Sequence, residues 1–330
     1  MTLAARLEAI WYGPHRPGWP LRVLAVLYGA VIAARRRLYR LGALRSHRLA
    51  APVVVIGNRV AGGTGKTPLV LALVEHFRRQ GYRPGVVSRG YGRRGRGLVR
   101  VRADTAAALS GDEPALIARR SGVPVVVCAD RVRAARALIA EGCDLIIADD
   151  GLQHLALGRD LEIEVVDAQR GYGNGLLLPA GPLREQPPEA FTGLRVINGG
   201  AGDAGGWPMR LRPGLLHPLD GGPPQPLSAL ENTRVHAVAG IGNPERFFAT
   251  LREHRLEVVE HRFVDHHAFT SADFEYGFEG AGAIVMTGKD AVKCRGIAPA
   301  GSYWLETSAE LPELFFIEVE HRLKGRGDGS

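Results

Sequence analysis

The chain has 330 residues, of which 45% are hydrophobic and 23% are charged. This composition is typical of a globular protein with a packed core, and the length is sufficient for two domains of ordinary size. Three cysteines, Cys128, Cys143 and Cys294, lie far apart without metal-ligand spacing. Their spacing favours small buried thiols in a reducing compartment over a disulfide framework or a metal site.

The net charge of +8 is unevenly distributed, with arginines concentrated in two stretches, residues 35–48 and 89–100. Basic clusters of this kind suit an anionic membrane surface or a phosphorylated substrate. Nucleic acid is the competing interpretation. However, no surface rich in aromatic residues is evident near the arginines, and the sequence has no familiar nucleic-acid motif. We therefore expect no nucleic-acid partner.

An apolar run near the N-terminus, residues 21–34, is followed directly by three arginines. The run is shorter than the roughly 20 residues that a transmembrane helix needs. It differs from a signal peptide because the charges come after it and no cleavage site is evident. Aromatic rings that favour a lipid interface accompany it at Trp11, Tyr12, Trp19 and Tyr28. We predict that residues 1–45 form a membrane-associated helical segment, with a soluble helix packed on the domain as the alternative.

The most informative stretch is a glycine-rich loop at 57–67, between an apolar run at 53–56 and an apolar helical stretch at 68–74. This strand–loop–helix context is the one that a phosphate-binding loop needs. Backbone N–H groups of such a loop surround phosphate oxygens, its lysine reaches the β- and γ-phosphates, and its threonine binds Mg²⁺. Val60 stands where the strict pattern has glycine, so a turn that only closes a βα unit is the alternative. The predicted nucleotide-binding residues are Ala61, Gly62, Gly63, Thr64, Gly65, Lys66 and Thr67.

Acidic residues follow in two later segments. Asp112 lies in the turn-like stretch 110–114, where it could cap the next helix or face the phosphates from the carboxyl edge of a strand. Asp149 and Asp150 directly follow an apolar strand predicted at 145–148. This is the Walker-B arrangement, which places a carboxylate beside Mg²⁺. One aspartate could meet the metal, directly or through water, while the other organises the site; a solvated acidic turn is the alternative.

Predicted strands and helices alternate with short turns from residue 53 to about residue 167, which indicates a doubly wound, mainly parallel α/β sheet. We therefore predict a P-loop NTPase-like kinase domain at 46–225. A Pro/Gly-rich linker is expected from about 199 to 226. After it, we predict a smaller α/β lobe at 226–330 that closes over the active site. Within the first domain, the loop 173–185 carries an arginine and a carboxylate that face the nucleotide or acceptor, or else forms a structural crossover.

Eight motifs in this order resemble those of the tetraacyldisaccharide 4'-kinase family of lipid A biosynthesis, and the resemblance covers nearly the whole chain. They are GGTGKTP (62–68), SRGYG (88–92), GDEP (111–114), DDGLQH (149–154), GNGLLLPAGPLRE (173–185), AGIGNPERFF (239–248), DHHAFT (265–270) and MTGKDAVKC (286–294). The resemblance implies transfer of the γ-phosphate of ATP to the 4'-hydroxyl of a tetraacyldisaccharide 1-phosphate, giving the 1,4'-bisphosphate lipid IVA. It also implies Mg²⁺, a place at the cytoplasmic face of the bacterial inner membrane, and membrane contact through the N-terminal segment. We predict no protein partner.

The resemblance also implies roles for individual residues. Asp112 would be the base on the acceptor hydroxyl, paired with His266, and Asp265 and His267 are alternatives to that histidine by adjacency. The catalytic residues so implied are Asp112, His266, Asp149 and Asp150, and the metal-site residues are Thr67, Asp149 and Asp150. The residues expected in or near the cleft are Arg89, Tyr91, Gln153, His154, Arg184 and Glu185.

Three other functions are compatible with a phosphate loop. Some switch ATPases or GTPases that move metals or partner proteins carry a lysine just before the paired glycines, where this chain has Ala61. A kinase for a soluble sugar or cofactor would share the ATP site but would not need the apolar run at 21–34. A membrane-bound regulatory module would bind nucleotide without chemistry, so replacing Asp112 by alanine should leave it unchanged.

Overall fold

The computed structural model describes residues 3–200, 205–275, 278 and 282–325. Its helices are α1 (Leu3–Tyr12), α2 (Trp19–Arg40), α3 (Lys66–Arg79), α4 (Ala107–Ser110), α5 (Asp112–Ser121), α6 (Arg131–Ala140), α7 (Pro244–Glu253), α8 (Gly288–Cys294) and α9 (Glu313–Lys324), with 3₁₀ turns η1 (Leu227–Leu230) and η2 (Ser271–Phe274). Its strands are β1 (Val53–Gly57), β2 (Pro84–Ser88), β3 (Val99–Val101), β4 (Val125–Val127), β5 (Leu145–Ala148), β6 (Leu161–Asp167), β7 (Leu194–Asn198), β8 (Trp207–Pro218), β9 (Gln225–Pro226), β10 (Arg234–Ala239), β11 (Glu257–Arg262), β12 (Ala283–Thr287) and β13 (Ser302–Glu310).

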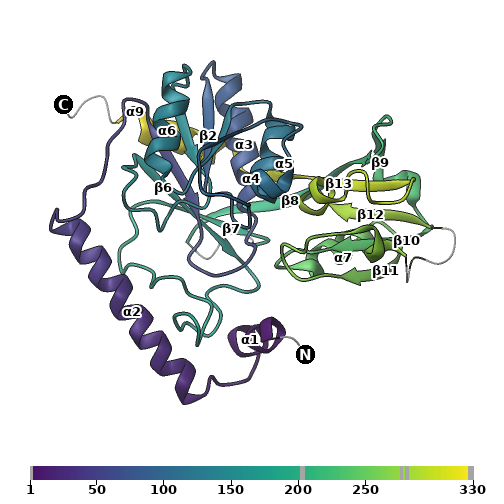
Figure 1. Ribbon diagram of the computed structural model, residues 1–330, viewed down its shortest axis with the longest axis horizontal. Helices are drawn as coiled ribbons and strands as arrows, with labels where there is room; N and C mark the ends of the chain where they lie inside the picture. The colour runs from purple at the N-terminus through teal and green to yellow at the C-terminus, as the bar shows by residue number, and fades with distance from the viewer. Residues whose placement is uncertain (1–2, 201–204, 276–277, 279–281, 326–330) are drawn as a thin grey trace.

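Within the described residues, thirteen strands form one sheet that extends through two lobes (Figure 1). In the first lobe the order is β8-β7-β6-β1-β5-β2-β4-β3, and every neighbouring pair is parallel except β3 with β4. β1 is buried along its whole length, as expected of an apolar run in the centre of a parallel sheet. Ligands of such sheets bind at the carboxyl ends of the strands, and β1 ends at the glycine-rich loop.

Helices cover both faces of this part of the sheet. On one face, Phe77 of α3, Ile117 of α5 and Phe315 of α9 belong to a single buried cluster with the strands. On the other face, Leu138 of α6 packs in a second cluster. The predicted doubly wound, mainly parallel α/β fold is therefore confirmed.

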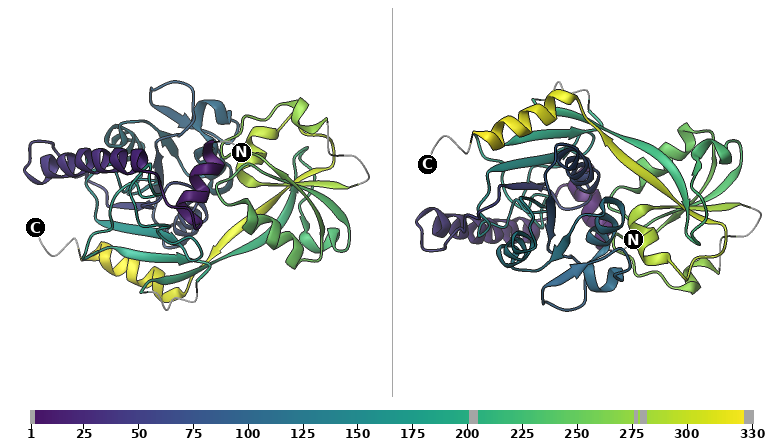
Figure 2. Two further views of the ribbon diagram at one scale, coloured as in Figure 1. Left: turned by 90° about the horizontal axis from the view of Figure 1, so that it is seen from below. Right: turned by 90° about the horizontal axis from the view of Figure 1, so that it is seen from above.

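Two long strands, β8 and β13, run from one lobe to the other (Figures 1 and 2). Residues 207–209 of β8 pair with β7, and residues 210–218 pair antiparallel with β13. These residues were predicted to belong to a linker at 199–226, and that prediction is wrong for the strand. Pro213 pairs with Thr307 where the register of the two strands shifts, and such irregular positions tolerate proline within a strand.

The last helix, α9, returns to the first lobe after β13. Phe315 and Val319, one turn apart, are fully buried there. Beside them, the His76 ring of α3 stacks on Phe316, and its Nε2 lies 2.8 Å from Glu320 Oε1. Residues 313–324 fall in the range predicted for the smaller lobe, yet they pack on the phosphate-loop lobe. Helical periodicity marks an apolar face but does not say which partner covers it.

The second lobe continues the sheet with β13, β12, β10 and β11, which are parallel to one another. Phe248 of α7 is fully buried in a cluster with Val235 and Val285 on these strands. Met286 and Cys294 lie in a further cluster that includes α8. Each lobe therefore has its own core.

The N-terminal helices lie along the outside of the first lobe, with α2 extending diagonally past it (Figure 1). Polar contacts attach them: Trp11 Nε1 donates to the Pro179 carbonyl oxygen at 3.0 Å. Tyr28 Oη donates to the Arg184 carbonyl oxygen at 2.8 Å. The large side chains that α2 leaves exposed are Trp19, Val23, Leu24, Val26, Leu27, Val31 and Leu38. Among the described helices, none combines the length and apolarity that crossing a membrane requires.

Candidate functional site

The glycine-rich loop joins the end of β1 to the start of α3. Gly62 and Gly65 have φ angles of 103° and 95°, which residues with a Cβ rarely adopt. A Cβ at Gly65 would lie 2.5 Å from Asn198 Nδ2, which itself donates to the Thr64 carbonyl oxygen at 2.9 Å. Because α3 begins at Lys66, the unpaired N–H groups of its first turn are available for phosphate oxygens.

Lys66 and Asp150 face each other beside this loop. Lys66 Nζ donates to Asn58 Oδ1 at 3.1 Å and lies 3.5 Å from Asp150 Oδ1. Arg184 Nη1 lies within 3.0 Å of both Asp150 oxygens. Although burial opposes ionisation, Lys66 and Arg184 hold the pKa of Asp150 below its ordinary value. The backbone of Asp150 has φ 51°, and Arg131 donates to its carbonyl oxygen at 2.7 Å.

Asp149 is fully buried beside Asp150. Its Oδ2 accepts a hydrogen bond from Ser88 Oγ at 3.2 Å. Burial, reinforced by the charges of Glu113 and Asp150, raises the pKa of Asp149 to about 7. A buried carboxylate with this pKa favours binding of either a proton or a cation.

Two buried oxygen atoms, Thr67 Oγ1 and Asp149 Oδ1, have no hydrogen-bond partner among the described residues. Hydroxyl and carboxylate oxygens are suitable ligands for Mg²⁺, which commonly uses one or two protein groups together with substrate phosphates and water. Within the part of the chain that the structure describes, no group of three or more His, Cys, Asp or Glu residues is placed to hold a metal. Thr67 and Asp149 each present an unpaired oxygen of the kind that Mg²⁺ binds.

Asp112 is the first residue of α5, Gly111 occupies the N-cap position, and the helix has no side-chain capping hydrogen bond. Gly111, with φ 89°, separates α4 from α5 and lets the second helix begin there. His266 reaches Asp112 from the second lobe, with Nδ1 3.1 Å from Oδ2. This hydrogen bond raises the pKa of His266 above its ordinary value, although burial opposes the shift.

The two neighbours of His266 make different contacts. His267 Nε2 lies 3.2 Å from Asp273 Oδ1. Asp265 Oδ1 lies 3.9 Å from His266 Nε2, the ring nitrogen that does not contact Asp112. Of the three adjacent candidates, His266 is therefore the one that the structure brings to Asp112.

The loop after β2 reaches the same place. The ring centre of Tyr91 lies 5.1 Å from that of His266, and the Tyr91 side chain is largely exposed. Arg89 is exposed on the same loop, two residues earlier. Tyr91 therefore borders the Asp112–His266 pair on its solvent side.

A second ion pair joins the two lobes beside the first, and sequence reasoning did not find it. Nζ of Lys289 in α8 donates to Oε1 of Glu113, the residue that follows Asp112 in α5. Burial works against both charges, but their mutual attraction raises the pKa of Lys289 and lowers that of Glu113. Both residues lie in motifs that the sequence shows, at 111–114 and 286–294. No feature of the sequence indicates that these motifs meet.

Gln153 and Glu185, which were expected in or near the cleft, belong to a partly buried network. Gln153 Nε2 donates to the Asn58 carbonyl oxygen at 3.1 Å and to Glu185 Oε1 at 3.0 Å. Glu185 also accepts from Arg59 Nη1 at 2.7 Å and pairs with Arg36 of α2. The network ties the loop after β1 and the segment after β5 to the N-terminal helix.

His154 lies at the end of the acidic segment and is partly buried. Burial, together with the positive charge of Arg131, lowers the pKa of His154 to about 4. The ring is therefore neutral near pH 7. Its Nε2 has no hydrogen-bond partner in the described residues, and Arg159 donates to its carbonyl oxygen at 2.7 Å.

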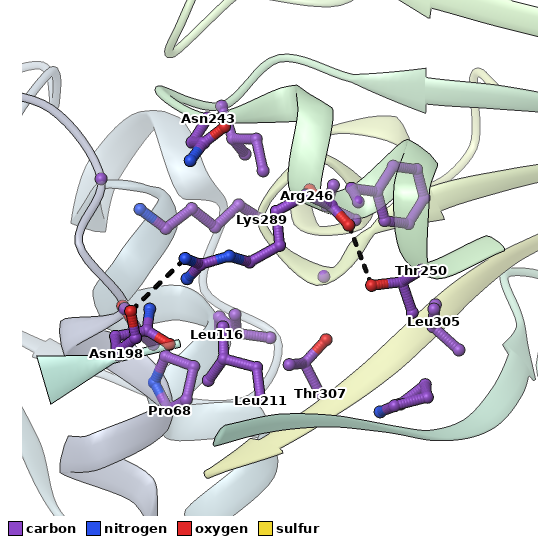
Figure 3. Close-up of a pocket in the computed structure, with 18 of the residues that line it drawn as sticks. Pro68, Leu116, Asn198, Leu211, Asn243, Arg246, Thr250, Lys289, Leu305 and Thr307 are labelled. Carbon is purple, nitrogen blue, oxygen red and sulfur yellow. Dashed lines mark hydrogen bonds between the residues drawn. The ribbon is translucent and has the colours of Figure 1, made fainter. Parts of the chain in front are cut away.

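A cavity opens between the lobes next to the phosphate loop (Figure 3). It is partly open to solvent. Apolar side chains from both lobes line it, among them Leu71, Leu116, Leu211, Phe247 and Trp304. Arg246 of the second lobe extends into the cavity, and its Nη2 lies 3.0 Å from Oδ2 of Asp167 in the first lobe. The Lys289 side chain points into the same cavity (Figure 3). Apolar walls with a few placed polar groups are typical of a small-molecule site.

The chain as a whole is similar to proteins of one family. A family model described as tetraacyldisaccharide-1-P 4'-kinase matches residues 17–324. A tetraacyldisaccharide 4'-kinase of Xanthomonas euvesicatoria pv. vesicatoria (strain 85-10) is 52% identical over 332 residues, covering 96% of each chain. The protein of that name from Stenotrophomonas maltophilia (strain R551-3) is 49% identical over 324 residues, covering 95% of each.

Among solved structures, the chain is similar to LpxK from Aquifex aeolicus, described as an "apo" form in complex with ATP. The TM-score is 0.74 at 27% identity, with 91% of this chain and 97% of that chain covered. The range matched by the family model, residues 17–324, spans both lobes. The chain belongs to the tetraacyldisaccharide-1-P 4'-kinase family.

Proposed function

We propose that this chain transfers the γ-phosphate of ATP to the 4'-hydroxyl of a tetraacyldisaccharide 1-phosphate, giving the 1,4'-bisphosphate lipid IVA. Membership of the family and relatives at 52% and 51% identity support the reaction. The observation that carries the site assignment is the contact between Asp112 and His266. It brings a carboxylate and an imidazole from two lobes together beside the phosphate-loop site.

In this proposal the loop at 61–67 holds the phosphates of ATP. Lys66 neutralises charge on the transferred group, and Arg184 stands on the other side of Asp150 as a second cation. Phosphoryl transfer depends mainly on such positioning and charge neutralisation. A magnesium ion held by Thr67 and by Asp149 or Asp150 would supply further charge neutralisation at the β- and γ-phosphates.

Asp112 is the base in this proposal, and His266 holds it in place. A sugar hydroxyl is a weak acid, so the base accepts the proton late, as the new O–P bond forms. The His266 Nδ1 contact fixes the orientation of the Asp112 carboxylate. Since the two residues come from different lobes, the pair is complete only when the lobes are together.

The N-terminal helices bring the enzyme to its lipid substrate. The exposed apolar side chains of α2 are accompanied by arginines in its last two turns, Arg35, Arg36, Arg37 and Arg40. An apolar surface of this kind with arginines at its end suits a helix lying in the headgroup region of an anionic membrane. The Tyr28–Arg184 contact connects α2 to the site itself. We place the enzyme at the cytoplasmic face of the bacterial inner membrane, where ATP is available.

The reaction is tested with γ-labelled ATP, Mg²⁺ and the lipid disaccharide 1-phosphate in detergent micelles, with a soluble amino sugar as a parallel acceptor. We expect label on the lipid alone. Label on the soluble sugar, or only as free phosphate, would contradict the substrate assignment. Asp112→Ala should lower turnover by roughly 10²–10⁴-fold while ATP binding persists. A regulatory module that only binds nucleotide would be unaffected by that substitution.

A further inference from the structure

Lys293, on the last turn of α8, lies between two carboxylates that come from different lobes. Its Nζ is 3.3 Å from Asp112 Oδ2 and 3.1 Å from Asp290 Oδ1. The side chain is 9% exposed, and the Nζ lies 5.1 Å from the ring centre of Phe269. A buried ammonium group between two carboxylates and an aromatic face has few other positions available. Lys293 therefore restricts where the Asp112 carboxylate can lie.

Asp290 anchors this lysine from within the second lobe. Its side chain is completely buried. One oxygen, Oδ2, accepts hydrogen bonds from the Gly240 N–H at 2.9 Å and from Thr287 Oγ1 at 2.6 Å. The other oxygen, Oδ1, faces Lys293. Within the described residues, Oδ1 and the Lys293 ammonium make no hydrogen bond, so two hydrogen bonds at Oδ2 and the ion pair at Oδ1 hold this carboxylate. Moving it would leave a buried charge unpaired.

The same anchor reaches His266 by a second path. The backbone N–H of His266 donates to the Gly240 carbonyl oxygen at 3.3 Å. Gly240 therefore contacts both residues, because its own N–H donates to Asp290. A Cβ at Gly240 would lie 3.0 Å from Asp290 Oδ1. His266 has φ 62°, and such sparsely populated backbone conformations persist only where the surroundings fix them.

We propose that Asp290 and Lys293 are positioning residues for the Asp112–His266 pair. Asp290 holds the His266 backbone through Gly240, and Lys293 holds the Asp112 carboxylate from the opposite lobe. Both contacts to Asp112 are made at Oδ2, which leaves Oδ1 for the acceptor hydroxyl. The inference rests on the proposed function, since the orientation of Asp112 matters to the rate if this carboxylate is the base.

The test uses the full chain in the lipid transfer assay. Lys293→Met removes the charge at similar length, Lys293→Arg retains a charge, and Lys324→Met is the matched control on the exposed end of α9. Lys293→Met is also combined with Asp112→Asn. For each protein, kcat, the KM for ATP, ATP binding and the melting temperature are measured. Lys293→Gln replaces the methionine variant if that variant melts below the assay temperature.

We expect Lys293→Met to lower kcat by about tenfold to hundredfold, with ATP binding changed by no more than about twofold. Lys293→Arg should recover part of this loss, and Lys324→Met should behave as the unmodified chain. In the Asp112→Asn background, Lys293→Met should cause no further loss, because the group through which it acts has been removed.

Several results would overturn the inference. Unchanged kcat in Lys293→Met, or an equal further loss in the Asp112→Asn background, would show that Lys293 does not act through Asp112. If Lys293→Arg and Lys293→Met have the same kcat and the same melting temperature, the charge at this position does not act on Asp112. Full turnover in Asp112→Asn alone would overturn both the base of the proposed function and this inference. If Asp112→Asn lowers kcat and Lys293→Met leaves kcat unchanged, only this inference is overturned and the proposed function stands.

Discussion

Arg184 holds Asp150 through a single nitrogen, with Nη1 3.0 Å from Oδ1 and 2.9 Å from Oδ2. Lys66 approaches the same carboxylate, 3.5 Å from Oδ1. The carbonyl oxygen of Arg184 meanwhile accepts a hydrogen bond from Tyr28 of α2. One residue thus connects the exposed N-terminal helix to the acid that faces the phosphate-loop lysine.

The substitutions Lys66→Ala and Asp150→Ala should each abolish transfer. Without Lys66 the transferred phosphoryl group loses its nearest cation. Without Asp150, the buried Lys66 and the partly exposed Arg184 are left without the carboxylate that pairs with both, so both cations should shift from their positions. The measurement is label transfer to the lipid acceptor, with the exposed acid Asp104→Ala as the control. Transfer by Asp150→Ala at the control rate would contradict the role of this pair.

The substitution Gly65→Ala tests the phosphate loop itself. The new Cβ would meet Asn198 Nδ2 at 2.5 Å, and alanine at φ 95° is strained by about 1–2 kcal/mol. We expect ATP affinity to fall by at least about tenfold, since the loop must shift away from the phosphates. Gly97→Ala is the matched control, because a Cβ at that position would meet nothing within 4 Å. Equal ATP affinity of the two variants, measured by equilibrium dialysis, would argue against binding by this loop.

Stability of the nucleotide-free protein should fall as the pH rises towards 7, and Asp149 is the expected cause. Burial raises the pKa of Asp149 to about 7, so the folded state holds a proton that the unfolded chain releases near its ordinary pKa of 3.8. Rising pH therefore favours unfolding across this window, by at most about 4 kcal/mol. In Asp149→Asn this loss is absent, so the variant should gain stability over the unmodified chain as the pH rises. Urea unfolding at about pH 5 and about pH 8 measures the free energy of unfolding of both proteins. If the difference between the two proteins is the same at both pH values, the assignment to Asp149 is wrong.

The strongly periodic parts of the fold were predictable from the sequence, and the long-range parts were not. The apolar runs at 53–56 and 145–148 predicted parallel strands. They form β1 and β5, and both strands are buried along their whole length. β8 was missed because the prolines and glycines near it resemble a linker. Its partner strand β13 is also distant from it in the sequence, so no local pattern indicates the pairing. The attachment of α9 to the first lobe depends on tertiary packing that no local pattern records.

At the site, local motifs predicted the phosphate loop and the two aspartates after β5. The resemblance to a family, and not the spacing, suggested that Asp112 pairs with His266, 154 residues away. Glu113 and Lys289 were missed although each lies in a recognised motif, because an ion pair between distant segments leaves no periodic trace. Gln153 and Glu185 were expected in or near the cleft, but no local pattern indicated that they contact each other or that Arg36 of α2 pairs with Glu185.

The exposed side of α2 should provide the membrane contact. Val26 and Val31 are 72% and 65% exposed, and burial of such side chains in lipid gives about 1–2 kcal/mol each. The double substitution Val26→Ser with Val31→Ser should therefore weaken partitioning into vesicles of zwitterionic and anionic phospholipid by at least about tenfold. Transfer to micellar substrate should persist, because neither valine lines the cavity. Leu314→Ser, which changes a comparably exposed residue on α9, is the control. Equal partitioning of the two variants in vesicle sedimentation would place the membrane contact elsewhere on the chain.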